Sequence, residues 1–344
     1  TFFPPNSPGL FLRRMSGWKT LFWARRVEQT LSGDFSTLAG SQLQQGLDDV
    51  VAAQAMFPVT SRVELRGFRG DGNELSSIPD GQLRTIWSRL MDRLLDVPGY
   101  RKMFRDAFPH KRLADLKFRD AANAIADFQK AAFHFLDSPF DRYLRGDDDA
   151  LTARQKRGAL VFYGKGGCGS CHSGSLMTDQ KFHNIAAPQI GPGKPPYEPL
   201  DPGRYLVDQR PSTKYAFRTP PLRNVEVTGP YLHSGAYDNL RDVIEHHLRP
   251  RKTLRQYDGE SLRPAVRAEL HDSPSVTRQL LSRLDWRLRI RSRIQRWRHH
   301  PLRVDDRDVD HLVAFLKSLT SPSIDTLDEG ITPESVPSGL PVDR

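Results

Sequence analysis

Hydrophobic positions in this chain recur mostly at helical spacing, so the pattern predicts a mainly α protein. Three amphipathic segments follow one another at 82–97, 100–108 and 118–136. Pro98 ends the first of them, and the turn sequence DSPFDRY (137–143) follows the third. We expect these three helices to be scaffold.

Two further helices are predicted beside the residues that carry chemistry. Residues 151–163 have an amphipathic pattern that runs into a Gly-rich stretch, where the backbone is free to turn. The segment LRDVIEHHLRP (240–250) places His247 on the same stripe as Leu240 and Ile244. Between these helices, the Gly- and Pro-rich residues 185–205 predict an irregular surface loop.

The segment 278–303 contains nine arginines and one acidic residue, Asp285. Its stretch from Trp286 to Ile294 alternates strictly, which suits a strand, whereas the leucine spacing suits a helix. We favour the helix because the surrounding pattern is helical. The segment could dock an acidic redox partner or an anionic membrane surface. Equally, it could be a solvated face whose arginine stems cover apolar surface.

Length and charge narrow the class of protein. The chain has 344 residues, enough for two domains, and a net charge of +10. No zinc-finger or RNA-binding motif accompanies the charge, so nucleic acid is not an expected partner. There is no apolar run of 18 residues and no signal-peptide pattern at residues 1–5, which leaves a cytoplasmic protein or the mature form of an exported one.

The only two cysteines are Cys168 and Cys171, and His172 follows at once. A zinc site would need a second pair of ligands, and a thioredoxin-like disulfide would need a preceding strand where a helix is predicted. Cys-x-x-Cys-His attaches haem c, because two thiols on one turn meet the vinyl groups while the imidazole reaches the iron. We therefore expect one covalent haem c with His172 as its proximal ligand.

The sixth iron ligand decides the chemistry, because an open position binds peroxide whereas a second strong ligand favours electron transfer. The candidates downstream are Met177, His183, His233, His246 and His247. Met177 is too close to His172 to cross to the other haem face without a very tight loop. His247 is favoured, since a buried imidazole on an apolar helix face needs a partner; the alternative for each histidine is a structural or surface role.

The sequence YAFRTPPLRNVEVTGPYLHSGAYDNLRDVIEHHLRP (215–250) is similar to the bacterial di-haem cytochrome c peroxidase family, which includes the MauG-type proteins. Further resemblances are PNSPGLF (5–11), LFWARRVE (21–28), FPVTSRVELRG (57–67) and LVAFLKSLT (312–320). The likeness therefore covers most of the chain. It implies a cytochrome c-like haem domain joined to a helical, loop-rich remnant of the family's N-terminal region.

The resemblance also implies roles for single residues. His172 would ligate the family's second, electron-transfer haem, and the distal ligand, Met or Tyr in other members, falls on His247. Two nitrogen ligands would lower the potential relative to a His/Met pair. Trp23 would match the tryptophan that relays electrons between two haems, and Glu64 the acid/base carboxylate beside the peroxidatic haem; without the resemblance these would be a core aromatic and a surface charge.

A calcium site is implied as well. Asn6, with the carbonyls of Thr228 and Pro230, would match the family's inter-haem calcium site, whose all-oxygen ligands suit a hard cation.

The departures from the family pattern concern the other haem. The family has two Cys-x-x-Cys-His motifs, and the first lies upstream of the segment at which this chain begins. The motif F-W-D-G-R has become Phe22-Trp23-Ala24-Arg25-Arg26, and Ser234 replaces the aspartate after His233. We therefore expect residues 1–150 to be the region that would face a missing first haem, 151–325 to be the haem domain, and 326–344 to be an extended tail.

The expected function is electron transfer through a haem c held by His172 and His247. The alternative is a peroxide-reducing cytochrome c peroxidase, or a MauG-like oxidant of a protein, whose peroxidatic haem domain is absent from this chain. Covalent haem implies maturation outside the cytoplasm, so we expect a periplasmic or otherwise exported protein whose leader has been removed. The expected partner is an acidic redox protein at 278–303, within a larger complex or at a membrane surface.

Overall fold

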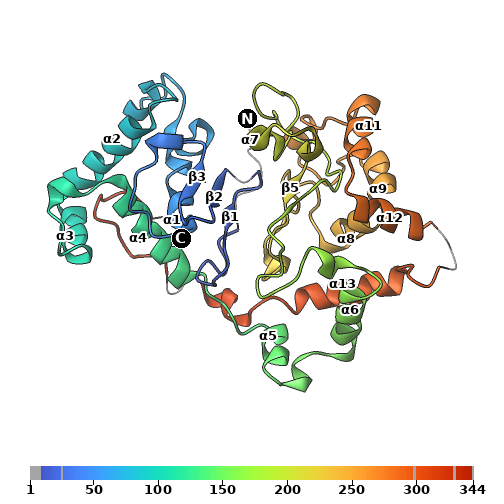
Figure 1. Ribbon diagram of the computed structural model, residues 1–344. Coiled ribbons are helices and arrows are strands. Elements are labelled where there is room, and N and C mark those ends of the chain that lie inside the picture. The colour runs from blue at the N-terminus through green and yellow to red at the C-terminus, as the bar shows by residue number, and fades with distance from the viewer. Residues whose placement is uncertain (1–8, 25, 297–299, 328–330, 343–344) are drawn as a thin grey trace. The chain divides into compact units, whose positions relative to one another are not determined.

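The computed structural model describes residues 9–24, 26–296, 300–327 and 331–342, and it confirms a mainly α fold (Figure 1). The chain divides into two compact units. The haem-motif unit comprises Thr1–Leu12, Phe22–Arg25 and Phe135–Ile324. The N-terminal unit comprises Arg13–Leu21, Arg26–His134 and Asp325–Arg344.

This division differs from the expected cut at residue 150, because helix α5 (Pro139–Leu144) belongs to the haem-motif unit. The Phe140 ring packs edge-on against Phe315, with 5.2 Å between centroids. Asp141 forms a buried ion pair with Arg223. Both contacts join residues that are far apart in sequence, so periodicity could not place this boundary.

Two helices that lie far apart in the sequence form the closest helix pair of the haem-motif unit. Helix α6 (Ala153–Tyr163) begins at a capping box, in which the Thr152 hydroxyl accepts from the Gln155 backbone N–H and the Gln155 side chain accepts from that of Thr152. It lies along α13 (Asp306–Lys317), and Figure 1 shows the pair side by side. Gly158 allows this close approach, because a Cβ there would overlap the carbonyl oxygen of His311.

The remaining helices of this unit surround that pair. Helix α8 (Leu240–Leu248) packs against α13, and the Arg-rich α12 (Trp286–Ile294) packs against α8 and α9 (Pro250–Gln256). Helix α11 (Pro274–Ser282) packs against α9. The shorter elements are β4 (Phe182–His183), which pairs antiparallel with β5 (Phe217–Arg218), and α7 (Tyr205–Asp208) and α10 (Pro264–Arg267).

The sequence prediction of helix for 278–303 is confirmed over most of its length, but the segment forms parts of two helices rather than one. Asp285 begins the second helix, because its carboxylate accepts a hydrogen bond of 2.8 Å from the backbone N–H of Arg287. Residues 297–299 of this segment lie outside the described residues. Residues 185–204 are largely irregular, as expected, but the prediction of a surface loop is wrong for its first part, because residues 186–189 and 191 are buried.

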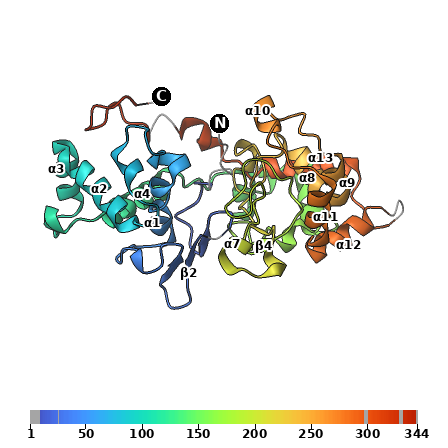
Figure 2. The same cartoon turned by 90° about the horizontal axis from the view of Figure 1, so that it is seen from above.

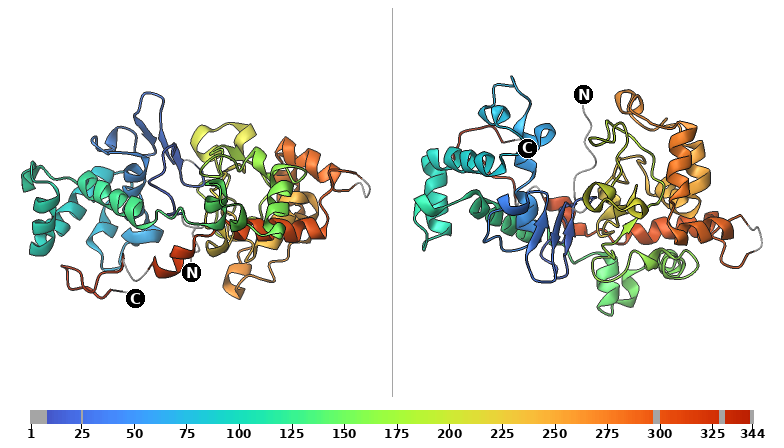
Figure 3. Two further views of the ribbon diagram at one scale, coloured as in Figure 1. Left: turned by 90° about the horizontal axis from the view of Figure 1, so that it is seen from below. Right: turned by 45° about the horizontal axis from the view of Figure 1, so that its top comes forward.

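In the part of the chain that the structure describes, the N-terminal unit combines one small sheet with several helices. Strands β1 (Thr20–Leu21), β2 (Val27–Gln29) and β3 (Phe35–Thr37) form an antiparallel sheet, drawn in blue in Figure 3. The buried α1 (Val50–Ala55) packs against α4 (Phe118–Ala132), and α2 (Leu83–Asp96) precedes α3 (Pro98–Ala107). Trp87 on α2 donates its indole N–H to the carbonyl of Met56 at 2.8 Å. The three helices predicted between 82 and 136 are thus confirmed.

The short helical turn Pro322–Thr326 is followed by residues 331–342, which contain little regular structure, and Pro337 lies against Gly99 of α3. In the part of the chain that the structure describes, no helix is long and apolar enough to cross a membrane.

We predict that Gly158→Ala lowers the free energy of unfolding of the haem-loaded protein by about 1–3 kcal/mol, because the added methyl group forces α6 away from α13. The urea unfolding midpoint measures this loss. Gly81→Ala is the matched control, because no atom lies within 4 Å of a Cβ at Gly81. Equal midpoints for the two variants would show that the α6–α13 approach is not tight.

Candidate haem site

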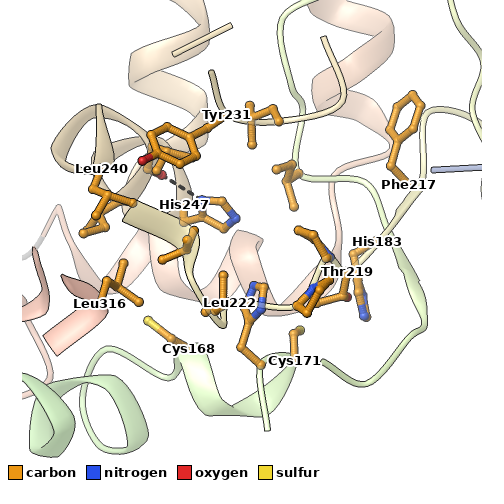
Figure 4. A pocket seen from close by; sticks show the side chains of 18 of the residues that line it. Cys168, Cys171, His183, Phe217, Thr219, Leu222, Tyr231, Leu240, His247 and Leu316 are labelled. Carbon is orange, nitrogen blue, oxygen red and sulfur yellow. Dashed lines mark hydrogen bonds between the residues drawn. The ribbon is translucent and has the colours of Figure 1, made fainter. Parts of the chain in front are cut away.

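A cavity of about 470 Å³ lies inside the haem-motif unit, below α8 and above the Cys-x-x-Cys-His turn (Figure 4). Its volume lies within the roughly 300–1,000 Å³ typical of cofactor and ligand pockets. Apolar side chains form most of the wall, among them Phe162, Leu222, Leu240, Ile244, Leu312 and Leu316. Cys168, Cys171, His172 and His247 face the same space.

The Gly-rich stretch after α6 turns the backbone under this cavity. The backbone N–H groups of Gly164 and Gly166 donate to the last carbonyls of α6, at Leu160 and Val161. Gly167 has φ of +61°, a left-handed conformation that favours glycine. The next three residues form a 3-10 turn, and the N–H of His172 donates to the carbonyl of Cys168 at 3.0 Å. This turn places both thiols and the imidazole on the cavity wall.

His172 and His247 face each other across the cavity, with 6.5 Å between ring centroids and 64° between ring planes. The His172 Nδ1–H donates to the carbonyl of Met177 at 3.2 Å, and the His247 Nδ1–H to that of Val243 at 2.7 Å. These bonds select the tautomer whose Nε2 carries the lone pair. Burial lowers the pKa of both imidazoles, that of His172 to about 4, so both are neutral at physiological pH.

The donor set fits a covalently bound haem. Neutral imidazole is a good ligand for iron, and metal–imidazole bonds are about 2 Å long. A metal centred between the rings would therefore bridge a centroid separation of this size. The two thiols border the same apolar space, and they are not joined by a disulfide. Cys168, Cys171, His172 and His247 could thus hold haem c with two axial histidines.

Among the other candidate ligands, His246 has both of its ring nitrogens engaged elsewhere. Met177 is buried, and its carbonyl already accepts from His172 on the proximal side. His246 is hydrogen-bonded at both ring nitrogens, to the hydroxyls of Tyr237 and Thr253 and to the carbonyl of Ile185. His233 lines the cavity and stacks on Phe217, with 3.5 Å between ring centroids, and its buried Nδ1 forms no hydrogen bond among the described residues.

His183 instead belongs to a buried ion cluster. Its Nε2–H donates to Asp179 at 2.9 Å and its Nδ1–H to Asp285 at 3.0 Å. Burial would lower the pKa of His183, but the two carboxylates outweigh it and raise the pKa to about 11. Burial likewise opposes ionisation of Asp179, yet the bonds from His183 and the Lys181 N–H lower its pKa to about 2. Cys171 lies beside the cluster, but both His183 nitrogens are occupied by carboxylates, so ion pairing describes this group better than metal ligation.

The residues implied by resemblance are placed as follows. Trp23 lines the cavity, and its carbonyl accepts from the backbone N–H of Arg218 at 2.8 Å. Thr228 and Pro230 also line the cavity. Glu64 is exposed and lies in a π-helical turn of the N-terminal unit. Asn6 lies outside the described residues, so the calcium assignment stays a prediction.

Sequence reasoning missed the arginines in the cavity wall, which are Arg218, Arg223, Arg287 and Arg291. Arg287 and Arg291 lie one turn apart on α12, and Leu288 between them lines the same cavity. The Arg291 guanidinium donates to the carbonyl of Gly167 at 2.7 Å, directly before Cys168. The i, i+4 spacing of the two α12 arginines around a buried leucine is the sequence signal, but the strict alternation of this segment hid it.

The chain is similar to known di-haem cytochrome c peroxidases and MauG proteins. The family model described as di-haem cytochrome c peroxidase matches residues 3–149. The methylamine utilization protein MauG of Methylorubrum extorquens is 32% identical over 204 residues, covering 59% of this chain and 50% of that protein. The cytochrome c551 peroxidase of Pseudomonas aeruginosa is 40% identical over 151 residues, covering 43% and 42%. These matches support membership of the di-haem cytochrome c peroxidase and MauG family.

A solved structure shows the same fold. The diheme peroxidase BthA of Burkholderia thailandensis matches 94% of this chain and 70% of its own, with a TM-score of 0.52 and 20% identity. The chain spans about half the length of the curated relatives it matches. Members of this family are haem c proteins, in agreement with the cofactor expected at Cys168–His172.

We predict that His247→Met raises the midpoint potential of the haem, because a thioether stabilises ferrous iron more than a second imidazole does. Spectroelectrochemical titration measures the potential. His110→Met is the control, since His110 is exposed in the N-terminal unit and should leave the potential unchanged. An unaltered potential and spectrum in His247→Met would rule out His247 as a ligand.

We predict that Asp285→Asn lowers stability most in mildly acidic solution. The raised pKa of His183 contributes stability that is complete below its unfolded value of about 6.5 and is lost as pH rises toward about 11. The lowered pKa values of Asp179 and Asp285 contribute stability that is lost as pH falls below about 4. The deficit in unfolding free energy should therefore be largest between about pH 4 and 6.5, at about 3–5 kcal/mol, and smaller at about pH 9.

Urea unfolding at several pH values tests this window. Asparagine can still cap α12, so the variant removes the charge while keeping the helix start. Asp148→Asn, at an exposed aspartate of the same unit, is the control. If the loss of unfolding free energy in Asp285→Asn did not change with pH, the inference that His183 is charged within this cluster would be wrong.

Proposed function

We propose that this chain holds one covalent haem c between His172 and His247 and passes electrons as part of an oxidoreductase of its family. The observation that carries the proposal is the opposition of the two imidazoles across a cavity that also exposes both thiols. When bound, the haem supplies a one-electron iron couple.

The chain's own residues would set the character of that couple. His172 and His247 would fill both axial positions, which leaves none for peroxide. The carbonyls of Met177 and Val243 hold the ring orientations and increase the basicity of the ligating nitrogens. Both effects stabilise ferric iron, so we infer a lower potential than a His/Met site would have.

Trp23 is the proposed route by which electrons leave this site. Its place on the cavity wall supports that role, and so does the family resemblance of the segment 21–28. The carbonyls of Phe22 and Trp23 accept hydrogen bonds from the side chain and backbone of Arg218, which hold the segment against β5. The indole is thereby positioned by backbone contacts on both sides of it.

A second candidate function is reduction of hydrogen peroxide, or oxidation of a protein substrate, at a second haem outside these residues. The cavity position of Trp23 favours it, because an electron relay there needs an acceptor. In this alternative Glu64 would transfer protons at the second haem. Asn6 and the carbonyls of Thr228 and Pro230 would hold calcium between the haems.

Since haem c is attached outside the cytoplasm, we propose a periplasmic location for either function.

Haem counting and carbon monoxide binding on one sample test the proposal. We expect one haem per chain by pyridine haemochrome assay, no peroxide turnover, and slow carbon monoxide binding by the ferrous protein. His247→Gly should bind carbon monoxide rapidly, because it opens the distal position. The double variant Cys168→Ala/Cys171→Ala is the control for covalent attachment and should lose haem in denaturant.

Two results would contradict the proposal. Carbon monoxide binding by the unaltered protein as fast as by His247→Gly would mean that the iron is open. Two haems per chain with peroxide turnover would favour the second candidate function instead.

A further inference from the structure

A group of arginines surrounds a second cavity of the haem-motif unit, between α9, α11 and α12. Arg251, Arg255, Arg278 and Arg289 line this space of about 570 Å³, which we call the arginine pocket. In both Figure 1 and Figure 2 the three helices lie next to one another. Asp272 is the one carboxylate among the lining residues.

The charges in the arginine pocket are not neutralised within the described chain. Elsewhere in the described chain, the buried Arg223 pairs with Asp141 and the half-buried Lys130 pairs with Asp49. Among the described residues, Arg251, Arg255 and Arg278 form no ion pair. Burial, followed by the neighbouring Arg289 and Arg255, lowers the pKa of Arg251. An anionic partner would relieve this repulsion.

Helix α12 separates the arginine pocket from the haem cavity. Arg287, Leu288 and Arg291 line the haem cavity, whereas Arg289 lines the arginine pocket. An α-helix with its side chains is about 10–12 Å across. A partner bound at the arginine pocket would therefore approach the haem cavity to within about one helix diameter.

The positively charged surface extends from the arginine pocket along α12, so it is wider than a small anion would need. Arg293 and Arg296 continue the positive charge along exposed positions of α12 and the turn that follows it. Trp286 and Ile290, one turn apart on the same helix, are 61% and 49% exposed. Arginine combined with exposed aromatic and aliphatic side chains is the composition of protein–protein interfaces.

We propose that the arginine pocket and the exposed side of α12 form the docking surface for an acidic redox protein that exchanges electrons with the haem. The proposal rests on the proposed function, because it names the partner class of that same haem. One electron would pass between the haem iron and the partner's redox centre, oxidising one and reducing the other, with no bond made or broken. The arginine side chains would attract the partner, and Trp286 and Ile290 would provide the apolar contact.

Stopped-flow oxidation of the ferrous protein tests the docking surface, with an oxidised acidic cupredoxin as the probe. The second-order rate constant should fall steeply as salt is added. Arg255→Gln/Arg278→Gln should lower it on the order of tenfold at low salt and match the unaltered protein at high salt. Arg142→Gln/Arg157→Gln removes the same charge at exposed positions of α5 and α6 and should leave it unchanged.

Each other outcome overturns the docking surface. Equal slowing in both double variants would show that only net charge matters, and no slowing in Arg255→Gln/Arg278→Gln would place docking elsewhere. Binding to phosphatidylglycerol vesicles that this variant loses, with the cupredoxin rate unchanged, would assign the pocket to a membrane surface. Oxidation by a small neutral quinone reports the haem by itself, so its failure would count against the proposed function rather than the docking surface.

Discussion

The opposition of His172 and His247 across one apolar cavity is the constraint on which the haem-motif unit depends. Two neutral imidazoles buried among leucines are costly unless each ring finds partners at both nitrogens. Backbone carbonyls satisfy one nitrogen of each ring, and the geometry leaves the other for a metal. Gly158 and Gly167 permit the α6–α13 contact and the turn that hold His172 at the required place.

Charged side chains have two separate roles around this cavity. The His183 cluster joins the loop after the haem motif to the start of α12, because Asp285 both accepts from His183 and caps that helix. The cluster thereby fixes a helix that is itself rich in unpaired positive charge. Helix α12 then presents Arg287 and Arg291 to the haem cavity and Arg289 to a pocket on its other side. One helix thus connects the cofactor with the surface that we propose for a partner.

The sequence predicted those parts of the structure that depend on local patterns. Helical periodicity indicated α2, α3, α4, α6 and α8, and the Cys-x-x-Cys-His spacing indicated the cavity-facing turn. The features that the sequence did not predict depend on long-range contacts. The unit boundary near residue 134 involves the contact of Asp141 with Arg223, and the position of α12 beside the haem motif involves the contact of Asp285 with His183. Neither partner can be chosen from the pattern of one segment.

The central claim is that both axial positions of the haem are histidine nitrogens. Pulsed electron paramagnetic resonance of the ferric protein, read for nitrogen hyperfine couplings from imidazole, tests it most directly. We predict a low-spin signal with two imidazole ligands in the unaltered protein and with one in His247→Met. A high-spin signal, or a single imidazole in the unaltered protein, would contradict the account.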